Sequence, residues 1–153
     1  METKSQSKNV LNFCKLSAKA CLPERATSGS AGLDLCACIN EEITIKPGDL
    51  VRIPCGIAIS IPSSEYAAFI FARSGLGVKH GITLSNGVGV IDSDYRGEIC
   101  VGLCNVGNES YTITPGERIA QMIIMRVESF PLIEVESLDV TGRGSGGFGS
   151  TGK

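Results

Sequence analysis

Short runs of β-forming residues, separated by turn clusters, constrain the fold of this chain more than any other feature. Residues 57–61 alternate isoleucine with alanine or serine, and this period of two is typical of a β-strand. Glycine, proline, serine and asparagine gather between such runs. Many short strands at this spacing predict an all-β sandwich, jelly roll or barrel. The other runs are 10–16, 33–39, 43–45, 50–53, 66–71, 98–105, 110–113 and 119–127.

Helical signals are weak, because no amphipathic window of three turns is present. A short helix is expected after Arg73, with Ser74 as its cap. The length of 153 residues and the absence of repeats and linkers indicate one domain. We expect the β-domain to span residues 1–140, with 1–9 flexible. Residues 141–153 contain six glycines and are expected to form a mobile C-terminal segment.

The composition excludes several classes of function. A net charge of −2 provides no basic field for a nucleic-acid groove, so no nucleic-acid partner is expected. The polar N-terminus and the lack of a long apolar run argue against secretion and against a membrane span. Seven cysteines, an odd number, favour reduced thiols in the cytoplasm or nucleus. With no Cys-x-x-Cys pair and one histidine, we interpret them as small buried hydrophobes rather than metal ligands.

Residues 86–98 combine an amide, three carboxylates, one aromatic ring and three glycines. Glycines permit tight bends and close approach of a ligand to the backbone. A hairpin with Asp92 and Tyr95 at its mouth is suited to hold a flat ligand and a reactive water. The alternative is that the acidic residues form only a solvated turn. No helix pattern follows Gly87 and Gly89, so this is not a dinucleotide-binding fingerprint.

Two further segments carry polar groups beside glycine. Arg73, Ser74 and Gly75 offer a guanidinium, a hydroxyl and open amides, which suit a phosphate, although a strand end with a surface arginine is equally simple. Asp34 lies in an apolar run, where a carboxylate is costly unless it is paired or close to a metal or water. It is either a turn residue or a group that holds waters of a hydrated Mg²⁺.

Residues 116–121 place Arg118 and Gln121 on a predicted strand, where Arg118 is suited to brace a neighbouring carboxylate. The last residues either form a flexible end without a role or act as a closing lid. The lid hypothesis rests on Phe148, an isolated aromatic ring, and on Arg143, Ser150 and Thr151 beside bare glycine amides, which bind anions.

Five short motifs therefore occur in order, at residues 31–37, 73–75, 86–97, 116–121 and 143–152. From about residue 10 to the C-terminus, this combination resembles the trimeric dUTPase family. The resemblance implies a jelly-roll-like β-subunit that assembles as a homotrimer, with active sites at subunit interfaces. It also implies Mg²⁺-dependent hydrolysis of dUTP to dUMP and pyrophosphate, which lowers dUTP and supplies dUMP for thymidylate synthesis.

The resemblance also implies residue roles. Asp92 is the general base that activates water, Tyr95 packs on the deoxyribose and rejects UTP, and Asp34 holds waters of the Mg²⁺. The uracil edge is read by Asn86, by the backbone of Gly89, Val90 and Ile91, and near Cys100. The residues implied to hold the phosphates are Arg73, Ser74, Gly75 and Gln121. The residues implied to close over the substrate are Arg143, Phe148, Gly149, Ser150 and Thr151.

Two alternatives stay open on the same fold. One is a nucleotide-responsive trimer that regulates a partner protein. A surface insertion or a missing motif would favour this alternative, and the sequence has neither. The other is an enzyme similar to a dCTP deaminase, which is weakened because residues 73–75 and 86–97 match the uracil enzyme.

Overall fold

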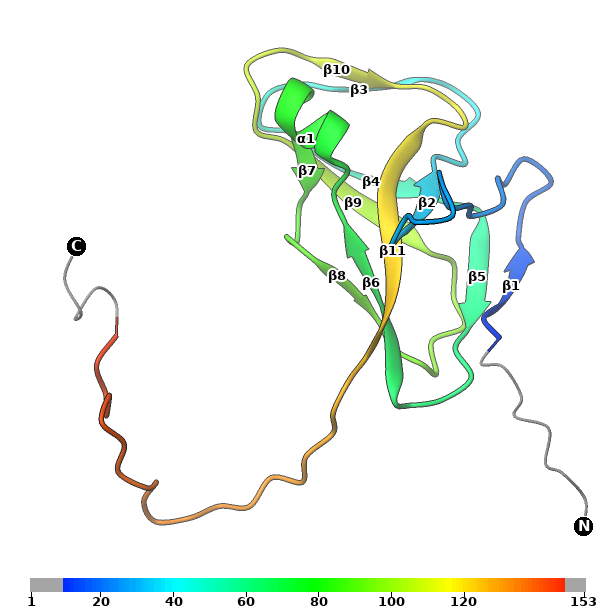
Figure 1. The fold of residues 1–153 in the computed structure, drawn as a ribbon. Helices are drawn as coiled ribbons and strands as arrows, with labels where there is room; N and C mark the ends of the chain where they lie inside the picture. The colour runs from blue at the N-terminus through cyan, green and yellow to red at the C-terminus, as the bar shows by residue number, and fades with distance from the viewer. Residues whose placement is uncertain (1–9, 148–153) are drawn as a thin grey trace, which may run out of the picture.

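Eleven short strands and one helix make up the described part of the chain, residues 10–147, in the computed structural model (Figure 1). The elements are β1 (Asn12–Lys15), β2 (Leu33–Cys36), β3 (Ile43–Ile45), β4 (Leu50–Pro54), β5 (Ile57–Ser60), β6 (Tyr66–Phe71), α1 (Ser74–His80), β7 (Ile82–Leu84), β8 (Gly89–Ile91), β9 (Cys100–Asn105), β10 (Tyr111–Ile113) and β11 (Arg118–Arg126). The prediction of an all-β protein with one short helix is confirmed.

The strands form small antiparallel sheets with the orders β1-β5, β10-β3, β4-β9-β7 and β2-β11-β6-β8. In the four-stranded sheet, β11 lies between β2 and β6, so strands far apart in sequence become neighbours. This sheet carries the motif residues: β2, β11 and β8 contain them, and β6 leads directly into another. Its register therefore determines how the site is arranged.

The core follows from the alternation of each strand. In β9, half-buried Cys100 and Gly102 alternate with buried Val101 and Leu103, because one face of the strand points inward. Branched aliphatic residues dominate the interior and suit a pleated, buried surface. The largest fully buried apolar side chains are Leu35, Ile45, Ile53, Ile57, Ile82, Ile99, Val101, Leu103, Ile113, Ile119 and Met122.

Asn105 is the one buried polar side chain among residues 10–147. Its Nδ2 donates to the carbonyls of Ile45 and Glu109, at 2.9 and 2.8 Å, and its Oδ1 accepts from the amide of Gly107 at 2.9 Å. All polar atoms of the side chain are thus paired, as burial requires. These bonds fix the turn before β10 against β3.

Helix α1 is short and is fixed at both ends. Arg73 occupies the N-cap position in an extended conformation and makes no side-chain cap bond, so Ser74 is the first helical residue and not the predicted cap. Leu76 is buried, and Gly81 ends the helix with a φ of 68°. A side chain at Gly81 would overlap the backbone of Gly107. Within the described residues, no helix is long and apolar enough to span a membrane.

The chain leaves the sheets after β11. The amide of Val127 donates to the carbonyl of Glu65 at 2.8 Å, and the following described residues run away from the strands (Figure 1). Large apolar side chains of this segment, Phe130, Leu132, Ile133, Leu138 and Val140, are 78–100% exposed. The packed part of the described chain thus ends near residue 127, and a domain boundary at 140 stays a prediction.

The cysteines differ in environment, and all seven are free thiols. Cys55 is buried, as expected for a small hydrophobe, whereas Cys14 is exposed on β1, where the expectation of burial is wrong. Within residues 10–147, strand β1 pairs only with β5, and all four of its residues are exposed. The remaining five thiols are half-buried.

Candidate active site

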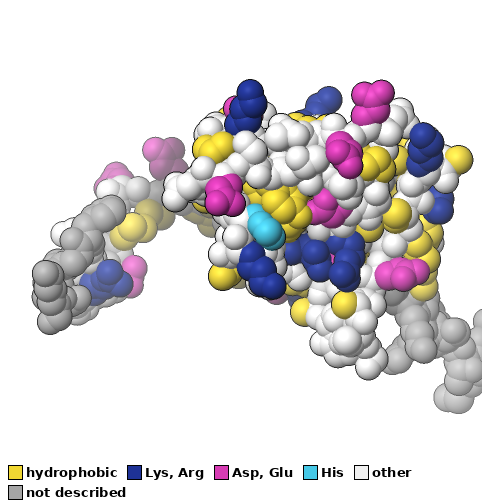
Figure 2. Space-filling model, turned by 90° about the horizontal axis from the view of Figure 1, so that it is seen from above, with side chains coloured by type: hydrophobic (Ala, Val, Ile, Leu, Met, Phe, Trp, Pro, Cys, Tyr) yellow, Lys and Arg dark blue, Asp and Glu magenta, His cyan; other side chains and the backbone are white. Residues whose placement is uncertain are grey.

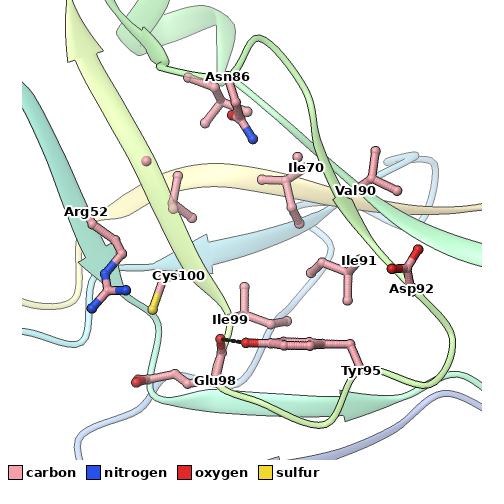
Figure 3. Close-up of a pocket in the computed structure, with 14 residues that line it drawn as sticks. Arg52, Ile70, Asn86, Val90, Ile91, Asp92, Tyr95, Glu98, Ile99 and Cys100 are labelled. Carbon is pink, nitrogen blue, oxygen red and sulfur yellow. Dashed lines mark hydrogen bonds between the residues drawn. The ribbon is translucent and has the colours of Figure 1, made fainter.

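The segment 86–98 forms one side of a pocket of about 290 Å³ (Figure 3). Strand β9 and Arg52 of β4 form the opposite side. Asn86 points into the pocket from one end, and the Tyr95 ring lies across the other. The lining residues are Arg52, Ile70, Leu84, Asn86, Gly89, Val90, Ile91, Asp92, Tyr95, Glu98, Ile99, Cys100, Val101 and Gly102.

Local geometry explains how the hairpin holds its polar groups at the pocket. Gly87 has a φ of 73°, and the amide of Val88 donates to the carbonyl of Asn86 at 2.9 Å, which forms a tight turn. Gly89 then pairs with Ile70 of β6, and a methyl group at Gly89 would lie 3.0 Å from Ile70 Cβ. Glycine therefore lets β8 lie close against the sheet, with Asn86 above the cavity.

Asp92 follows β8 directly, and its side chain is exposed. Among residues 10–147, its carboxylate has no ion pair or hydrogen bond, and only its backbone carbonyl accepts, from the amide of Tyr95 at 3.2 Å. A carboxylate at the edge of a pocket without a protein partner is available to accept a proton from a bound water.

Two charged lining residues, Arg52 and Glu98, are not among the site residues predicted from the sequence. Arg52 reaches the pocket because β4 pairs with β9, where it lies opposite Gly102. No local signal predicts this pairing. Glu98 ends the segment 86–98, whose acidic residues are also consistent with a solvated turn, whereas its Oε1 accepts from the amide of Gly56 at 2.9 Å. Burial raises the pKa of the neighbouring Cys100 thiol, and the charge of Glu98 raises it further.

A second cluster lies on β2 and β11 and at the end of β6. Both carboxylate oxygens of Asp34 are paired: Oδ1 accepts from Arg73 Nε at 3.1 Å and Oδ2 from Arg118 Nη1 at 3.0 Å. The predicted bracing role of Arg118 is confirmed. Arg73 Nη1 also donates to the Arg118 carbonyl at 3.0 Å. The guanidinium of Arg73 is thereby fixed, and its Nη2 has no partner among the described residues.

This cluster borders a pocket of about 180 Å³. Gln121 Nε2 donates to the Ala72 carbonyl at 3.0 Å, which fixes the amide beside the pocket. Gly32 is buried and lies close to Gln121, so a methyl group on Gly32 would lie 3.0 Å from Gln121 Oε1. The lining residues are Ala26, Ser30, Gly32, Asp34, Arg73, Ser74, Gly75 and Gln121.

The surface beside this second pocket is basic. Figure 2 shows Lys and Arg side chains next to the single histidine, and a shallow hollow there is lined by Arg73, Lys79, His80 and Arg118. Glu117 also borders the hollow, but its Oε1 accepts from the Tyr111 hydroxyl at 2.6 Å. Burial and this bond raise the pKa of Tyr111 to about 12. A group of cations with few free acids suits a ligand with several negative charges.

The two pockets are separate within one chain and share no lining residue. Strands β6 and β8 are antiparallel, and Ile91 at the end of β8 pairs with Ala68 near the start of β6. Asp92 therefore lies near the start of β6, whereas Arg73 follows its end. At about 3.3 Å per residue, six residues of strand separate the two by roughly 20 Å. One chain therefore does not bring Asp92 and Arg73 to the same ligand atom.

The structure places most of the predicted site residues at one pocket or the other. Arg143 borders neither; its Nε donates to the Gly146 carbonyl at 2.8 Å in the extended C-terminal segment. At the first pocket lie Asn86, Gly89, Val90, Ile91, Asp92, Tyr95 and Cys100. At the second lie Asp34, Arg73, Ser74, Gly75 and Gln121. Outside the described residues are Phe148, Gly149, Ser150 and Thr151.

The chain is thus an antiparallel β-protein with a glycine hairpin at one pocket and a separate cluster of arginines at another, and such a cluster suits a ligand with negative charges. The dUTPase family model matches residues 18–152, and the chain belongs to the dUTPase family. The prediction made from its five motifs is confirmed.

Similar proteins agree with this assignment. A deoxyuridine 5'-triphosphate nucleotidohydrolase of Desulfitobacterium hafniense is 54% identical over 131 residues, which cover 86% of this chain and 87% of that protein. One from Escherichia coli is 53% identical over 132 residues, with coverage of 86% and 87%. A structure of the Staphylococcus bacteriophage 80alpha dUTPase with dUPNHPP has a TM-score of 0.86 and 29% identity, covering 95% of this chain and 100% of that one. The predicted jelly-roll-like subunit is confirmed.

Proposed function

We propose that this protein hydrolyses dUTP to dUMP and pyrophosphate. The observation that carries the proposal is the first pocket, a cavity of about 290 Å³ that is lined by Asn86, the β8 backbone and Asp92, whose carboxylate has no partner among residues 10–147. The names of the similar proteins point to the same substrate.

Asp92 acts as the general base in the proposed reaction. It accepts a proton from a water molecule, whose oxygen attacks the α-phosphorus in line with the leaving group. A new bond forms between that oxygen and the α-phosphorus. The bond from the α-phosphorus to the bridging oxygen breaks, and its electron pair leaves with pyrophosphate. No covalent intermediate with the protein is involved, so positioning and electrostatics supply the rate.

Uracil is selected at the end of the first pocket where Asn86 lies (Figure 3). The Asn86 amide and the backbone of Gly89, Val90 and Ile91 offer donors and acceptors in fixed positions. Cytosine presents a donor where uracil presents an acceptor, which leaves buried groups unpaired and costs several kcal/mol. The side chains around C5 exclude the thymine methyl. Tyr95 packs on the deoxyribose and leaves no space for a 2′-hydroxyl.

The second cluster holds the phosphate chain. Arg73 offers Nη2 from a guanidinium already fixed by Asp34, and Ser74 and Gly75 offer a hydroxyl and a backbone amide at the start of α1. Gln121 contributes from β11. A positive charge held in place stabilises the leaving pyrophosphate without reorganisation during the reaction.

The described residues fit a Mg²⁺ ion held mainly by the substrate phosphates. No three His, Cys, Asp or Glu side chains within residues 10–147 converge to hold a metal. Asp34 has the oxygen atoms that Mg²⁺ prefers, but both are paired with arginine, so it would hold the ion only through a water molecule. When bound, the ion neutralises charge on the phosphates.

Assembly as a homotrimer completes the proposed site. The first pocket of one chain and the second pocket of another meet over one dUTP, because the two lie roughly 20 Å apart within a chain. The apolar side chains of the segment after β11 are exposed within the described chain and are suited to pack on a neighbour; they are Phe130, Leu132, Ile133, Leu138 and Val140. Residues Arg143, Phe148, Gly149, Ser150 and Thr151 then close over the base and phosphates.

A nucleotide panel with pyrophosphate detection tests the proposal. Purified protein with Mg²⁺ is expected to release pyrophosphate from dUTP and hardly from dTTP, dCTP or UTP, and EDTA is expected to abolish the release. Comparable turnover of all four nucleotides contradicts it. Ammonia release from dCTP would support the deaminase alternative instead.

A further inference from the structure

The Tyr95 ring is attached to the protein at its hydroxyl end. Residues 92–97 connect β8 to β9 without a strand partner, and Tyr95 is 46% exposed. Its hydroxyl donates to the main-chain carbonyl of Glu98 at 3.0 Å (Figure 3). In an unpaired loop, such a bond determines where an exposed ring lies.

Glu98 is itself anchored through its side chain. The Oε1 atom accepts from the amide of Gly56 at 2.9 Å, in a partly buried position. Gly56 is buried in the turn between β4 and β5, and a side chain on it would overlap Cys38 and Ala20. The residue that carries the acceptor for the Tyr95 hydroxyl is therefore attached to the turn between β4 and β5 as well as to its own loop.

The next residue continues this attachment. Buried Ile99 donates its amide to the Ile57 carbonyl at 2.8 Å and accepts from the amide of Cys55 at 2.9 Å. Together with the bond from Gly56 to Glu98, these contacts join the end of the hairpin to residues 55–57. Only the Glu98 carboxylate in this set is a side-chain group, so it is the member that mutation can remove.

Gly97 fits under the ring. A methyl group at Gly97 would overlap the hydroxyl and ring carbons of Tyr95, so the ring lies directly against this glycine. Ile91 and Ile99 also lie near the ring (Figure 3). The ring is confined by contact with a glycine and, at its tip, by a hydrogen bond.

We propose that Glu98 is a positioning residue that fixes the Tyr95 ring and thereby determines selectivity for deoxyribose over ribose. This inference rests on the proposed function. A 2′-hydroxyl adds a single oxygen atom, and an aromatic ring excludes that atom only if the ring cannot move aside. Positioning to within about 0.5 Å requires support from residues that are themselves held. The bond between Glu98 and Gly56 provides that support.

The test compares kcat/KM for UTP with kcat/KM for dUTP in matched variants. Glu98→Ala removes the acceptor for Gly56 and is expected to raise the UTP to dUTP ratio about tenfold or more. Glu98→Gln keeps an acceptor oxygen of the same length and is expected to hold the ratio near that of wild type. Asp94→Ala removes an exposed acid from the same loop and is the control, with an unchanged ratio.

A second variant keeps the test decisive if Glu98→Ala does not fold. Tyr95→Phe leaves Glu98 intact and removes only the hydroxyl that bonds to it, so it is expected to raise the same ratio. If Glu98→Ala folds and its UTP to dUTP ratio is within twofold of wild type, the inference is overturned. If Glu98→Ala does not fold, an unchanged ratio in Tyr95→Phe overturns it.

The proposed function fails by a different result, because it is overturned only if the wild-type protein does not hydrolyse dUTP.

Discussion

At the scale of single residues, Asp92 has the clearest role to test. Its carboxylate is exposed and makes no contact that stabilises the described fold, so Asp92→Asn is expected to fold and to bind dUTP. Because an amide does not accept the proton from water, turnover is expected to fall by about 10² to 10⁴. Pyrophosphate release and a binding titration measure the two effects. Turnover close to wild type rules out Asp92 as the base.

The thiols give a second prediction at this scale. Burial and the neighbouring Cys21 raise the pKa of Cys36 to about 11, and Cys55 is buried with its pKa also raised, first by burial. At pH 8 their thiolate forms are rare, whereas Cys14 is exposed. Iodoacetamide is therefore expected to modify Cys14 first and Cys36 and Cys55 slowest. Peptide mass spectrometry measures the extent of modification at each cysteine over time. All seven cysteines react in guanidinium; equal rates in native protein contradict the prediction.

The residue scale also shows what the sequence can indicate about a site. Asn86, Asp92 and Tyr95 are close along the chain, so one hairpin brings them together, and their grouping is predictable. Arg52 reaches the same pocket through the pairing of β4 with β9, which no local pattern reveals. The ion pairs of Asp34 are an intermediate case, because the cost of an unpaired carboxylate in an apolar strand predicts a partner without identifying both arginines.

At the scale of elements, prediction succeeds where the pattern repeats. Strands β5, β6 and β11 agree with their expected ranges to within a few residues, because each is a run rich in apolar, β-forming residues. No pattern predicts β7, whose three residues are extended because β9 lies beside them. The cap of α1 is misassigned for a related reason: Arg73 is held in an extended conformation by Asp34, which is distant in sequence.

The end of α1 gives a prediction about stability. Gly81 has a φ of 68° and lies against the backbone of Gly107, whereas Gly48 has a φ of 86° with open space around it. Gly48→Ala is expected to cost only the backbone strain of roughly 1–2 kcal/mol. Gly81→Ala adds an overlap worth about 1–3 kcal/mol more. Urea unfolding at a constant m-value measures both free energies, and equal losses contradict the packing argument.

At the scale of the whole molecule, the division of the site between two pockets has the largest consequence. The motifs appear in the sequence without any indication of which of them meet in one chain. The register of β6 with β8 supplies that information, because it places Asp92 and Arg73 toward opposite ends of the sheet. The proposed complete site then takes residues from two copies of the chain, and this separates the proposed trimer from an enzyme with a site in each monomer.

Mixing two inactive variants tests this requirement. Asp92→Asn keeps the phosphate cluster and Arg73→Ala keeps the base, and each alone is expected to be nearly inactive. If they are unfolded together in equal amounts and refolded, a site that takes Arg73 from one chain and Asp92 from another is intact in about a quarter of cases under random assembly. Activity near a quarter of wild type is therefore expected. In the control, the two variants are refolded separately and then mixed, and this mixture is expected to stay nearly inactive. If each chain forms its own site, no combination restores both groups, and the refolded mixture stays as inactive as its components.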